Sequence, residues 1–233
     1  MPQAEVTVLC APYEDCEAFD SKQTHKIIRT KQRVLLPLPK LAKQIRSIIK
    51  ERNIDFVLFD PAVPVGILGP KIGIPYGVIL HGAEVTIPGR IPVLNQILRK
   101  VLRNSQLVVT AGQYSTEEAE RAAKTSLPVV IVPPGVDEKR FKPLTPQQRV
   151  HARSKYDLNE SDEVILTLSR LVPRKGMDVL IKACADLQAS RPRLKLLIAG
   201  TGRDQRRLEN IARRKKAPVT FLGHVPDAEI PSL

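Results

Sequence analysis

Apolar residues along this chain follow two different spacings. Short runs rich in β-branched residues predict buried strands, whereas longer stretches in which apolar residues return every three or four positions predict amphipathic helices. The predicted strands are residues 5–11, 26–29, 54–59, 77–80, 107–110 and 129–132. The predicted helices between them are residues 40–52, 61–71, 92–103 and 116–124, the last capped by Ser115 or Thr116. Strand and helix alternating on this scale predict a parallel sheet with helices on its faces.

A polar, proline-containing stretch divides this alternation. Residues 142–160 carry Pro143 and Pro146 among mostly polar side chains, and we place an interdomain linker there. Beyond it the alternation returns, with strands at 164–168, 195–199 and 219–222 and helices at 177–184 and 204–215. We therefore expect an α/β protein of two Rossmann-like units, residues 1–145 and 146–233. Three strands leave apolar surface uncovered, so the second unit is expected to be incomplete.

The composition is that of an ordinary globular protein. Hydrophobic residues make up 42% of the 233 positions, which is enough for a packed core and excludes global disorder. No apolar run approaches the length of a membrane-spanning helix, and the first residues lack the basic and apolar regions of a secretory signal. The three cysteines, Cys10, Cys16 and Cys184, have no metal-type spacing. This pattern leads us to expect a reduced, cytoplasmic location.

The chain is strongly basic, with a formal net charge of +13. Such a charge suits anionic partners, namely nucleic acid, acidic lipid headgroups or phosphorylated ligands. Aromatic residues make up only 4% and tryptophan is absent, which disfavours binding of single-stranded nucleic acid by base stacking. On the predicted helix 40–52, four cations share the face opposite the apolar residues: Lys40, Lys43, Arg46 and Lys50. This helix is either an ordinary surface helix or a contact with an anionic membrane.

A short basic loop joins one predicted strand to the next predicted helix. It reads S-R-L-V-P-R-K-G over residues 169–176 and follows the apolar run 164–168. Arg170, Arg174 and Lys175 would stand beside the free N–H groups of a helix N-terminus, an arrangement that attracts a pyrophosphate. The alternative is a solvated basic turn.

Two further strand ends carry candidate residues. His81 ends the predicted strand 77–80, where open α/β sheets bind ligands, and Gly82 allows close approach of backbone and ligand. A histidine in the core or at a cap is the alternative. The triplet G-T-G at residues 200–202 resembles the start of a dinucleotide-binding fingerprint, but Gln205 occupies the third glycine position. The triplet therefore belongs either to a nucleotide-side loop or to a plain turn.

Four motifs together resemble a known family. They are H-G-A-E at 81–84, V-P-P-G-V-D-E-K-R-F at 132–141, S-R-L-V-P-R-K-G at 169–176 and L-L-I-A-G-T-G at 196–202. The set resembles the family 4 glycosyltransferases of the GT-B fold. The similarity is greatest to the GDP-mannose-dependent phosphatidylinositol mannosyltransferases and their relatives, and it covers nearly the whole chain.

The resemblance implies a GT-B fold and a retaining transfer of a hexose from a nucleotide sugar to a lipid or glycan acceptor. Arg170 and Lys175 match family positions that bind the diphosphate, and His81 matches a histidine near the transferred sugar. Further candidate donor contacts are Gly82, Glu84, Arg174, Gly200 and Gly202. GDP-mannose is the expected donor and no cofactor is expected. Because the chain has no D-x-D carboxylate pair, no metal is expected either, and the fixed cations would stabilise the leaving diphosphate instead.

The resembled family extends beyond both ends of this chain. It begins with a strand and a glycine-rich loop that approaches donor and acceptor, and it later carries a glutamate pair, E-x7-E, that holds the donor sugar and ribose. Neither feature is present in these residues. We therefore expect a fragment, truncated at both ends, that is inactive by itself.

Other interpretations stay open at this point. The chain could be a non-catalytic remnant, or another nucleotide-sugar enzyme of GT-B fold such as a 2-epimerase. A basic nucleic-acid-binding protein is suggested by charge alone. For the transferase we expect a cytoplasmic location, peripheral on the inner face of the cell membrane, with a nucleotide-sugar donor and a lipid or glycan acceptor as partners.

Overall fold

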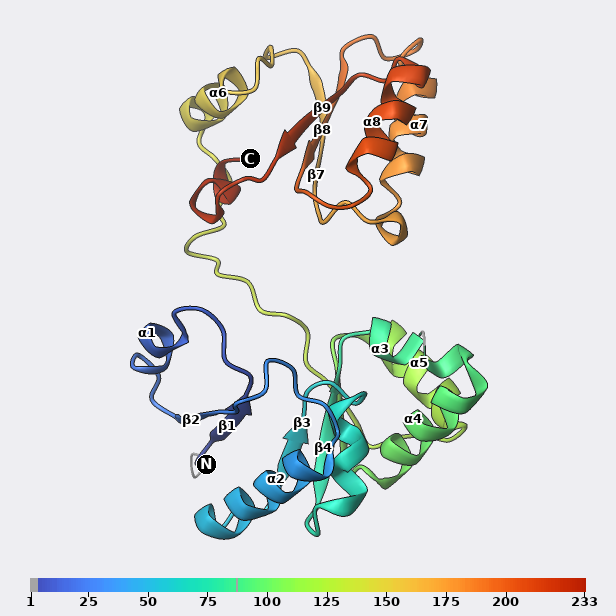
Figure 1. The fold of residues 1–233 in the computed structure, drawn as a ribbon. Coiled ribbons are helices and arrows are strands. Elements are labelled where there is room, and N and C mark those ends of the chain that lie inside the picture. Colours follow the sequence, from blue (N-terminus) through green and yellow to red (C-terminus); the bar gives the residue numbers. More distant parts are fainter. Residues whose placement is uncertain (1–3, 87) are drawn as a thin grey trace. The chain divides into compact units, whose positions relative to one another are not determined.

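A computed structural model describes residues 4–86 and 88–233, except for the side chains of Ala83 and Glu84. Within it the chain forms two compact units, Met1–Gly135 and Val136–Leu233 (Figure 1). Each unit is built from parallel strands with helices between them. The α/β class expected from the sequence is confirmed.

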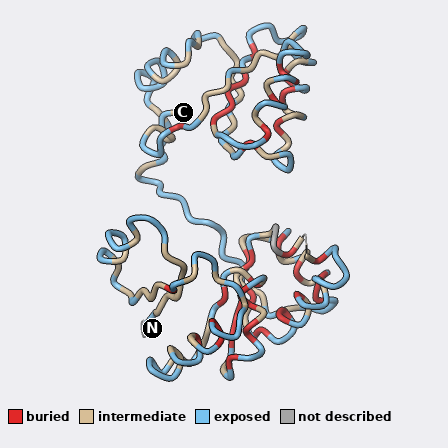
Figure 2. The backbone as a smooth tube through the Cα atoms, viewed as in Figure 1, coloured by how far each residue is buried: buried red, intermediate tan, exposed pale blue. Residues whose placement is uncertain are grey.

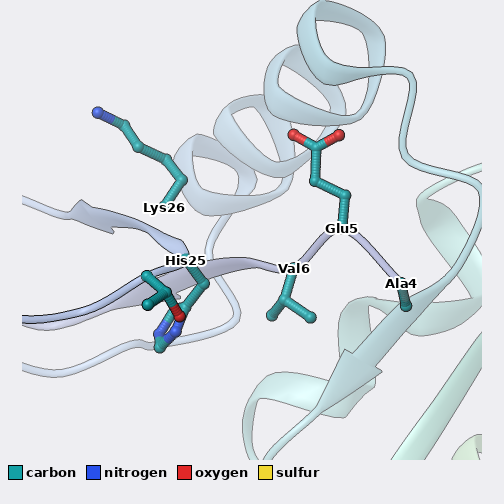
Figure 3. A pocket seen from close by; sticks show the side chains of 6 residues that line it. Ala4, Glu5, Val6, His25 and Lys26 are labelled. Atoms are coloured by element: carbon teal, nitrogen blue, oxygen red, sulfur yellow. The ribbon is translucent and has the colours of Figure 1, made fainter. Parts of the chain in front are cut away.

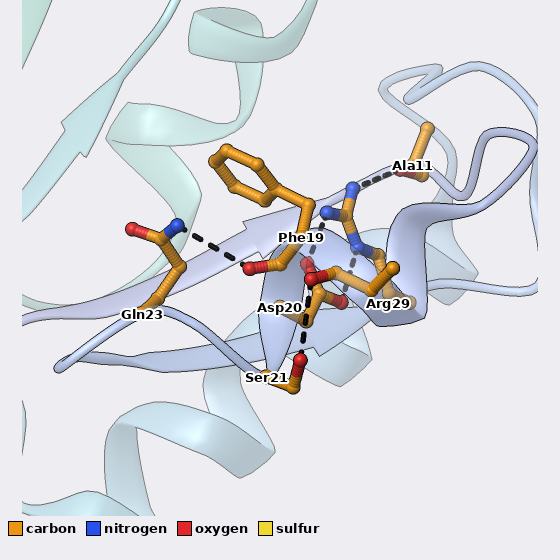
Figure 4. Close-up of polar contacts among 7 residues, drawn as sticks. Ala11, Phe19, Asp20, Ser21, Gln23 and Arg29 are labelled. Carbon is orange, nitrogen blue, oxygen red and sulfur yellow. Dashed lines mark hydrogen bonds and ion pairs between the residues drawn. The ribbon is translucent and has the colours of Figure 1, made fainter.

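The first unit begins with a small two-stranded parallel sheet. Strands β1 (Thr7–Cys10) and β2 (Lys26–Arg29) pair in parallel, and helix α1 (Cys16–Asp20) lies between them in the chain. Arg29 stabilises the segment that joins the two strands. Its guanidinium donates from Nε to Asp20 Oδ2 at 2.9 Å and from Nη1 to the carbonyl of Ala11 at 2.8 Å (Figure 4). The hydrogen bond from Arg29 lowers the pKa of Asp20 below its ordinary value.

A four-stranded parallel sheet forms the centre of the first unit. Its strands stand in the order β3 (Val57–Phe59), β4 (Tyr76–Leu80), β5 (Leu107–Thr110) and β6 (Val129–Ile131). The helical elements are α2 (Pro39–Arg52), α3 (Ala83–Thr86), α4 (Pro92–Asn104) and α5 (Gln113–Ala123), with the 3₁₀ turns η1 (Val65–Lys71) and η2 (Pro88–Arg90). Since all four strands run the same way, their carboxyl ends meet at one edge of the sheet.

The core of the first unit lies between this sheet and its helices. Leu41, Val78, Leu80, Leu98 and Leu102 are each at most 1% exposed. Figure 2 shows buried positions along the strands and the inward sides of the helices. Burying one such side chain contributes about 1.5–3 kcal/mol to the free energy of folding. Burial of the apolar runs therefore stabilises both the sheet and the helices that pack on it.

The second unit has a three-stranded parallel sheet in the order β7 (Glu163–Leu168), β8 (Leu194–Ala199), β9 (Val219–Gly223). Helices α7 (Met177–Leu187) and α8 (Gln205–Lys215) pack on each other, and Ile181, Ile198 and Leu208 are fully buried. The remaining elements are α6 (Pro146–Ser154) and the 3₁₀ turns η3 (Pro173–Lys175) and η4 (Asp227–Ser232). Leu166 and Leu168 on β7 are 39% and 47% exposed, so apolar surface stays open on this sheet.

Residues 142–160, expected as a linker, contain a helix in the structure. Thr145 accepts from the backbone N–H of Gln148, whose side chain accepts from the N–H of Thr145, and this capping box starts α6. Within the second unit, Arg140 forms an ion pair with Asp227. The division between the two compact units falls earlier, after Gly135.

Two predicted helices differ from their expected form. The segment 61–71 contains a 3₁₀ helix from Val65 to Lys71, and Pro70 within it disfavours an α-helix, because its ring would clash with the carbonyl four residues earlier. Helix α5 begins at Gln113 after Gly112, without a side-chain cap, so the predicted cap at Ser115 or Thr116 is wrong. Among the described residues, none of the helices has the length and apolar character needed to cross a membrane.

Candidate functional site

His81 lies at the carboxyl end of β4, as expected, and its partner comes from the neighbouring strand. Its Nε2 lies 2.8 Å from Oδ1 of Asp60, which directly follows β3. The two side chains are 60% and 52% exposed, so both are accessible to a ligand. The sequence analysis missed Asp60, although its place directly after a buried strand was a usable signal.

Gly82 turns the chain from β4 into α3. Its φ of +114° lies in a region that side chains disfavour, and its carbonyl accepts from the N–H of Thr86 at 2.9 Å. The glycine is therefore explained by the turn itself. The contact of Gly82 with the nucleotide-sugar donor stays a prediction. The side chain of Glu84, also predicted as a donor contact, lies outside the described part of the structure.

A third strand end adds hydroxyl groups to the same edge of the sheet. Thr110, the last residue of β5, is 1% exposed, and its Oγ1 lies 2.8 Å from Oγ1 of Thr116 in α5. A methyl group placed on Gly82 would lie 3.8 Å from Oγ of Ser115, so this helix start lies beside the turn after His81. The edge thus gathers a carboxylate, an imidazole and hydroxyls.

In the second unit, the basic loop lies at the carboxyl end of β7. Arg170, Arg174 and Lys175 are all exposed. Gly176, with φ +69°, makes the turn into α7, and the loop ends there at a helix N-terminus. All three cations are thus exposed on the loop that precedes this helix N-terminus, and their contact with a diphosphate stays a prediction.

The loop is held by backbone contact with residues 200–202, which follow β8. The N–H of Leu171 donates to the carbonyl of Thr201 at 2.9 Å. A Cβ at Gly200 would lie 2.0 Å from the carbonyl oxygen of Ser169, and one at Gly202 would lie 2.2 Å from that of Leu171. Both glycines are therefore required for packing against the basic loop. Their contact with the nucleotide-sugar donor stays a prediction.

Beside this loop, a buried carboxylate starts α8. Asp204 is 7% exposed in its side chain and accepts from Arg207, Nε to Oδ1, at 2.6 Å. Arg207 also reaches Asp178 of α7 at 3.5 Å. The hydrogen bond from Arg207 holds the pKa of Asp204 below its ordinary value of 3.8. The pair therefore joins α8 to α7 behind the basic loop.

We expect the second unit to lose stability in acid because of this pair. A carboxyl whose pKa is lowered by folding contributes stability that is full above its ordinary pKa, here 3.8, and is lost as the pH falls through the folded pKa. Urea unfolding of the chain at a series of pH values measures the loss. In Asp204→Asn the acid-dependent part should be smaller, whereas Asp186→Asn, at an exposed position on α7, should leave the curve unchanged. Equal curves for wild type and Asp204→Asn would contradict this prediction.

One surface hollow lies at the amino ends of strands and is not a candidate ligand site. It has a volume of about 700 Å³ and is lined by residues at or before the starts of β1 and β2 (Figure 3): Ala4, Glu5, Val6, Thr24, His25 and Lys26. These are the amino ends of the strands, opposite to the ends where open parallel sheets bind ligands. In the described ranges there is also no group of three His, Cys, Asp or Glu side chains placed to hold a metal ion.

Several solved structures share this architecture. The structure of Anabaena Alr3699/HepE in complex with UDP matches with a TM-score of 0.75 at 19% identity, covering 96% of this chain and 63% of that one. WaaG, a glycosyltransferase involved in lipopolysaccharide biosynthesis, matches with a TM-score of 0.64 at 16% identity, covering 97% and 72%. The likeness at these identities shows the fold, which is that of GT-B enzymes, as the sequence analysis expected.

The sequence comparisons define the family. Residues 3–140 match the family described as Glycosyltransferase Family 4, and residues 148–233 match Glycosyl transferases group 1. The chain belongs to glycosyltransferase family 4.

Two similar curated relatives are mannosyltransferases. The GDP-mannose-dependent monoacylated alpha-(1-6)-phosphatidylinositol monomannoside mannosyltransferase of Corynebacterium glutamicum is 36% identical over 216 residues, covering 91% of this chain and 56% of the relative. The GDP-mannose-dependent alpha-(1-6)-phosphatidylinositol monomannoside mannosyltransferase of Mycolicibacterium smegmatis is 32% identical over 237 residues, covering 98% and 61%. The chain thus spans less than two thirds of the length of either relative.

Proposed function

We propose that this chain is part of a retaining, metal-independent hexosyltransferase that moves mannose from GDP-mannose to a lipid or glycan acceptor. The observation that carries the proposal is the exposed basic loop with Arg170, Arg174 and Lys175 at the N-terminus of α7, held in place by residues 200–202. The names of the similar relatives supply the donor and the sugar.

The proposed chemistry needs what this loop offers. In the transfer, the bond between the sugar C1 and the β-phosphate oxygen breaks, and its electron pair leaves with the nucleoside diphosphate. A new bond forms between C1 and the acceptor hydroxyl oxygen, whose proton passes to the departing diphosphate. Arg170 and Lys175 would stabilise the charge that grows on the diphosphate, and cations aimed at that charge lower the barrier more than they tighten substrate binding.

The test is direct. Radiolabelled mannose transfer from GDP-mannose to a lipid extract is measured with a protein that contains this chain, and GDP binding to the chain itself is measured by calorimetry. We expect transfer in the first assay and saturable GDP binding, weakened by Arg170→Ala, in the second. Salt-dependent binding to random DNA without any GDP binding would instead favour a nucleic-acid-binding protein.

We also propose that α2 attaches the protein to an anionic membrane. Its cations Lys40, Lys43, Arg46 and Lys50 are exposed, whereas Leu41 and Ile45 on the other side are buried in the core. Electrostatic attraction of each cation to an anionic lipid surface contributes about 1 kcal/mol and weakens with salt.

Vesicle co-sedimentation checks this attachment. Changing Lys40, Lys43 and Lys50 to Gln together should reduce binding to vesicles with acidic lipids by about 100-fold, since each lost charge costs about 1 kcal/mol. The matched control changes three exposed lysines of the second unit, Lys182, Lys195 and Lys215, and should bind as wild type does. Equal binding of the wild type to neutral and acidic vesicles would refute the idea.

A further inference from the structure

Asp60 and His81 form a contact in the first unit, apart from the basic loop on which the proposed function rests. Their side chains meet at 2.8 Å, from Oδ1 of Asp60 to Nε2 of His81. The two residues are far apart in the sequence and are brought together because β3 and β4 are neighbours in the sheet. The contact thus lies at the carboxyl edge of the sheet, the side on which open α/β sheets bind ligands.

The backbone beneath this pair is firmly fixed. Asp60 follows Phe59, which is 5% exposed, and His81 follows Leu80, which is fully buried. The ring of Phe59 packs edge-on against Tyr76, with ring centroids 5.9 Å apart, and the Tyr76 hydroxyl donates to the carbonyl of Val101 at 2.8 Å. Since both strand ends are anchored in the core, the two side chains leave the sheet from fixed points.

The pair contributes little to folding by itself. Exposed ion pairs are worth about 0–1 kcal/mol, and both of these side chains are more than half exposed. A fixed geometry at an accessible strand end is instead what a binding site requires.

Hydrogen-bond chemistry defines the state of the ring. An ionised carboxylate can only accept, so the imidazole donates to Asp60 from Nε2. The contact therefore places a proton on Nε2 and holds the plane of the ring, as carboxylates do for histidines that act on substrates or bind metals.

We propose that Asp60 is a positioning residue for His81: it fixes the ring orientation and the tautomer in which His81 meets the hexose of the nucleotide sugar. The inference rests on the proposed function and on the family resemblance, in which His81 matches a histidine near the transferred sugar. Asp60 itself acts through the imidazole.

The first experiment reads the ring directly in the chain labelled with ¹⁵N-histidine. Long-range ¹H–¹⁵N correlation spectra, recorded well above the ordinary histidine pKa of about 6.5, report the tautomer of each ring. His81 is assigned by the signal that His81→Gln removes. We expect the Nε2–H form in the wild type. In Asp60→Asn, the amide can donate to Nε2, so the Nδ1–H form should gain population while His25, His151 and His224 stay unchanged.

The second experiment measures mannose transfer by a protein that contains this chain. Asp60→Asn should lower turnover by about 10- to 100-fold, the scale found for residues that orient metal-ligating histidines. On a His81→Ala background the same change should cost nothing further, because the group through which Asp60 acts is absent. Asp55→Asn, at an exposed position before the start of β3, is the matched control and should transfer as wild type does.

Two results would overturn the proposal. One is an unchanged His81 tautomer in Asp60→Asn. The other is a loss of turnover in Asp60→Asn that is as large without His81 as with it, since Asp60 would then act independently. Absence of transfer by the wild type would contradict the proposed function instead, and the spectra would still decide whether Asp60 controls the ring.

Discussion

Replacing Arg170 or Lys175 with Ala, in a complete enzyme that contains this chain, should lower mannose transfer from GDP-mannose by at least about 100-fold each, the scale observed when one hydrogen-bond donor to a developing negative charge is removed. Both residues are exposed at the carboxyl end of the sheet of the second unit; Arg170 precedes η3, and Lys175 is its last residue. The loss should appear mainly in kcat, because the charge on the leaving diphosphate grows towards the transition state.

A matched control separates this effect from loss of positive charge in general. Arg193 is exposed directly before β8, at the amino end of the same sheet. Arg193→Ala removes one cation from the opposite end of the sheet and should leave transfer and GDP binding unchanged. Turnover of Arg170→Ala or Lys175→Ala close to that of the wild type would exclude the leaving-group role.

The second large effect should come from the glycines that face the basic loop. A Cβ at Gly200 would lie 2.0 Å from the carbonyl oxygen of Ser169, and one at Gly202 would lie 2.2 Å from that of Leu171. Backbone atoms cannot move aside as side chains do, so either alanine must shift the loop that carries Arg170. We expect a destabilisation of about 3 kcal/mol in urea unfolding, at the upper end of the usual cost of overpacking, together with loss of GDP binding.

Gly223 provides the comparison for backbone strain. Its φ of +69° is positive, like the +120° of Gly200, but a Cβ at Gly223 would meet nothing within 4 Å. Gly223→Ala should therefore cost only about 1 kcal/mol, the usual scale of a left-handed residue without a clash. If Gly200→Ala and Gly223→Ala were equally stable, close approach of the backbones would not be the reason for the glycine at position 200.

Much of the fold could be predicted because the signal is local. The strand at 26–29 and the strand at 107–110 have the same bounds in the structure as in the sequence analysis. Apolar period and β-branched content act over a few residues, so they are visible without knowing the neighbours. The failures arose where tertiary context or proline chemistry intervened, as in the 3₁₀ turn η1 and the uncapped start of α5.

The candidate site residues likewise include some with a local sequence signal and some whose role depends on tertiary contacts. His81 and Arg170 could be proposed from the sequence because His81 directly follows one apolar run and Arg170 stands two positions after another, and the carboxyl ends of parallel strands are where ligands bind. Gly200 and Gly202 were recognised as part of a loop, but the reason for glycine at these positions was not. The backbone that they approach belongs to the loop after another strand, so the local sequence does not reveal it.

The sequence by itself determined the α/β class, the order of the elements and the strand ends at which candidate functional residues lie, because these follow from local periodicity and from the direction of parallel strands. Only the tertiary structure decided which of those places meet. Asp60 reaches His81 because β3 lies beside β4, and Arg207 reaches both Asp204 and Asp178 because α7 packs on α8. Such contacts depend on how strands and helices pair in space, which the spacing of residues along the chain does not encode.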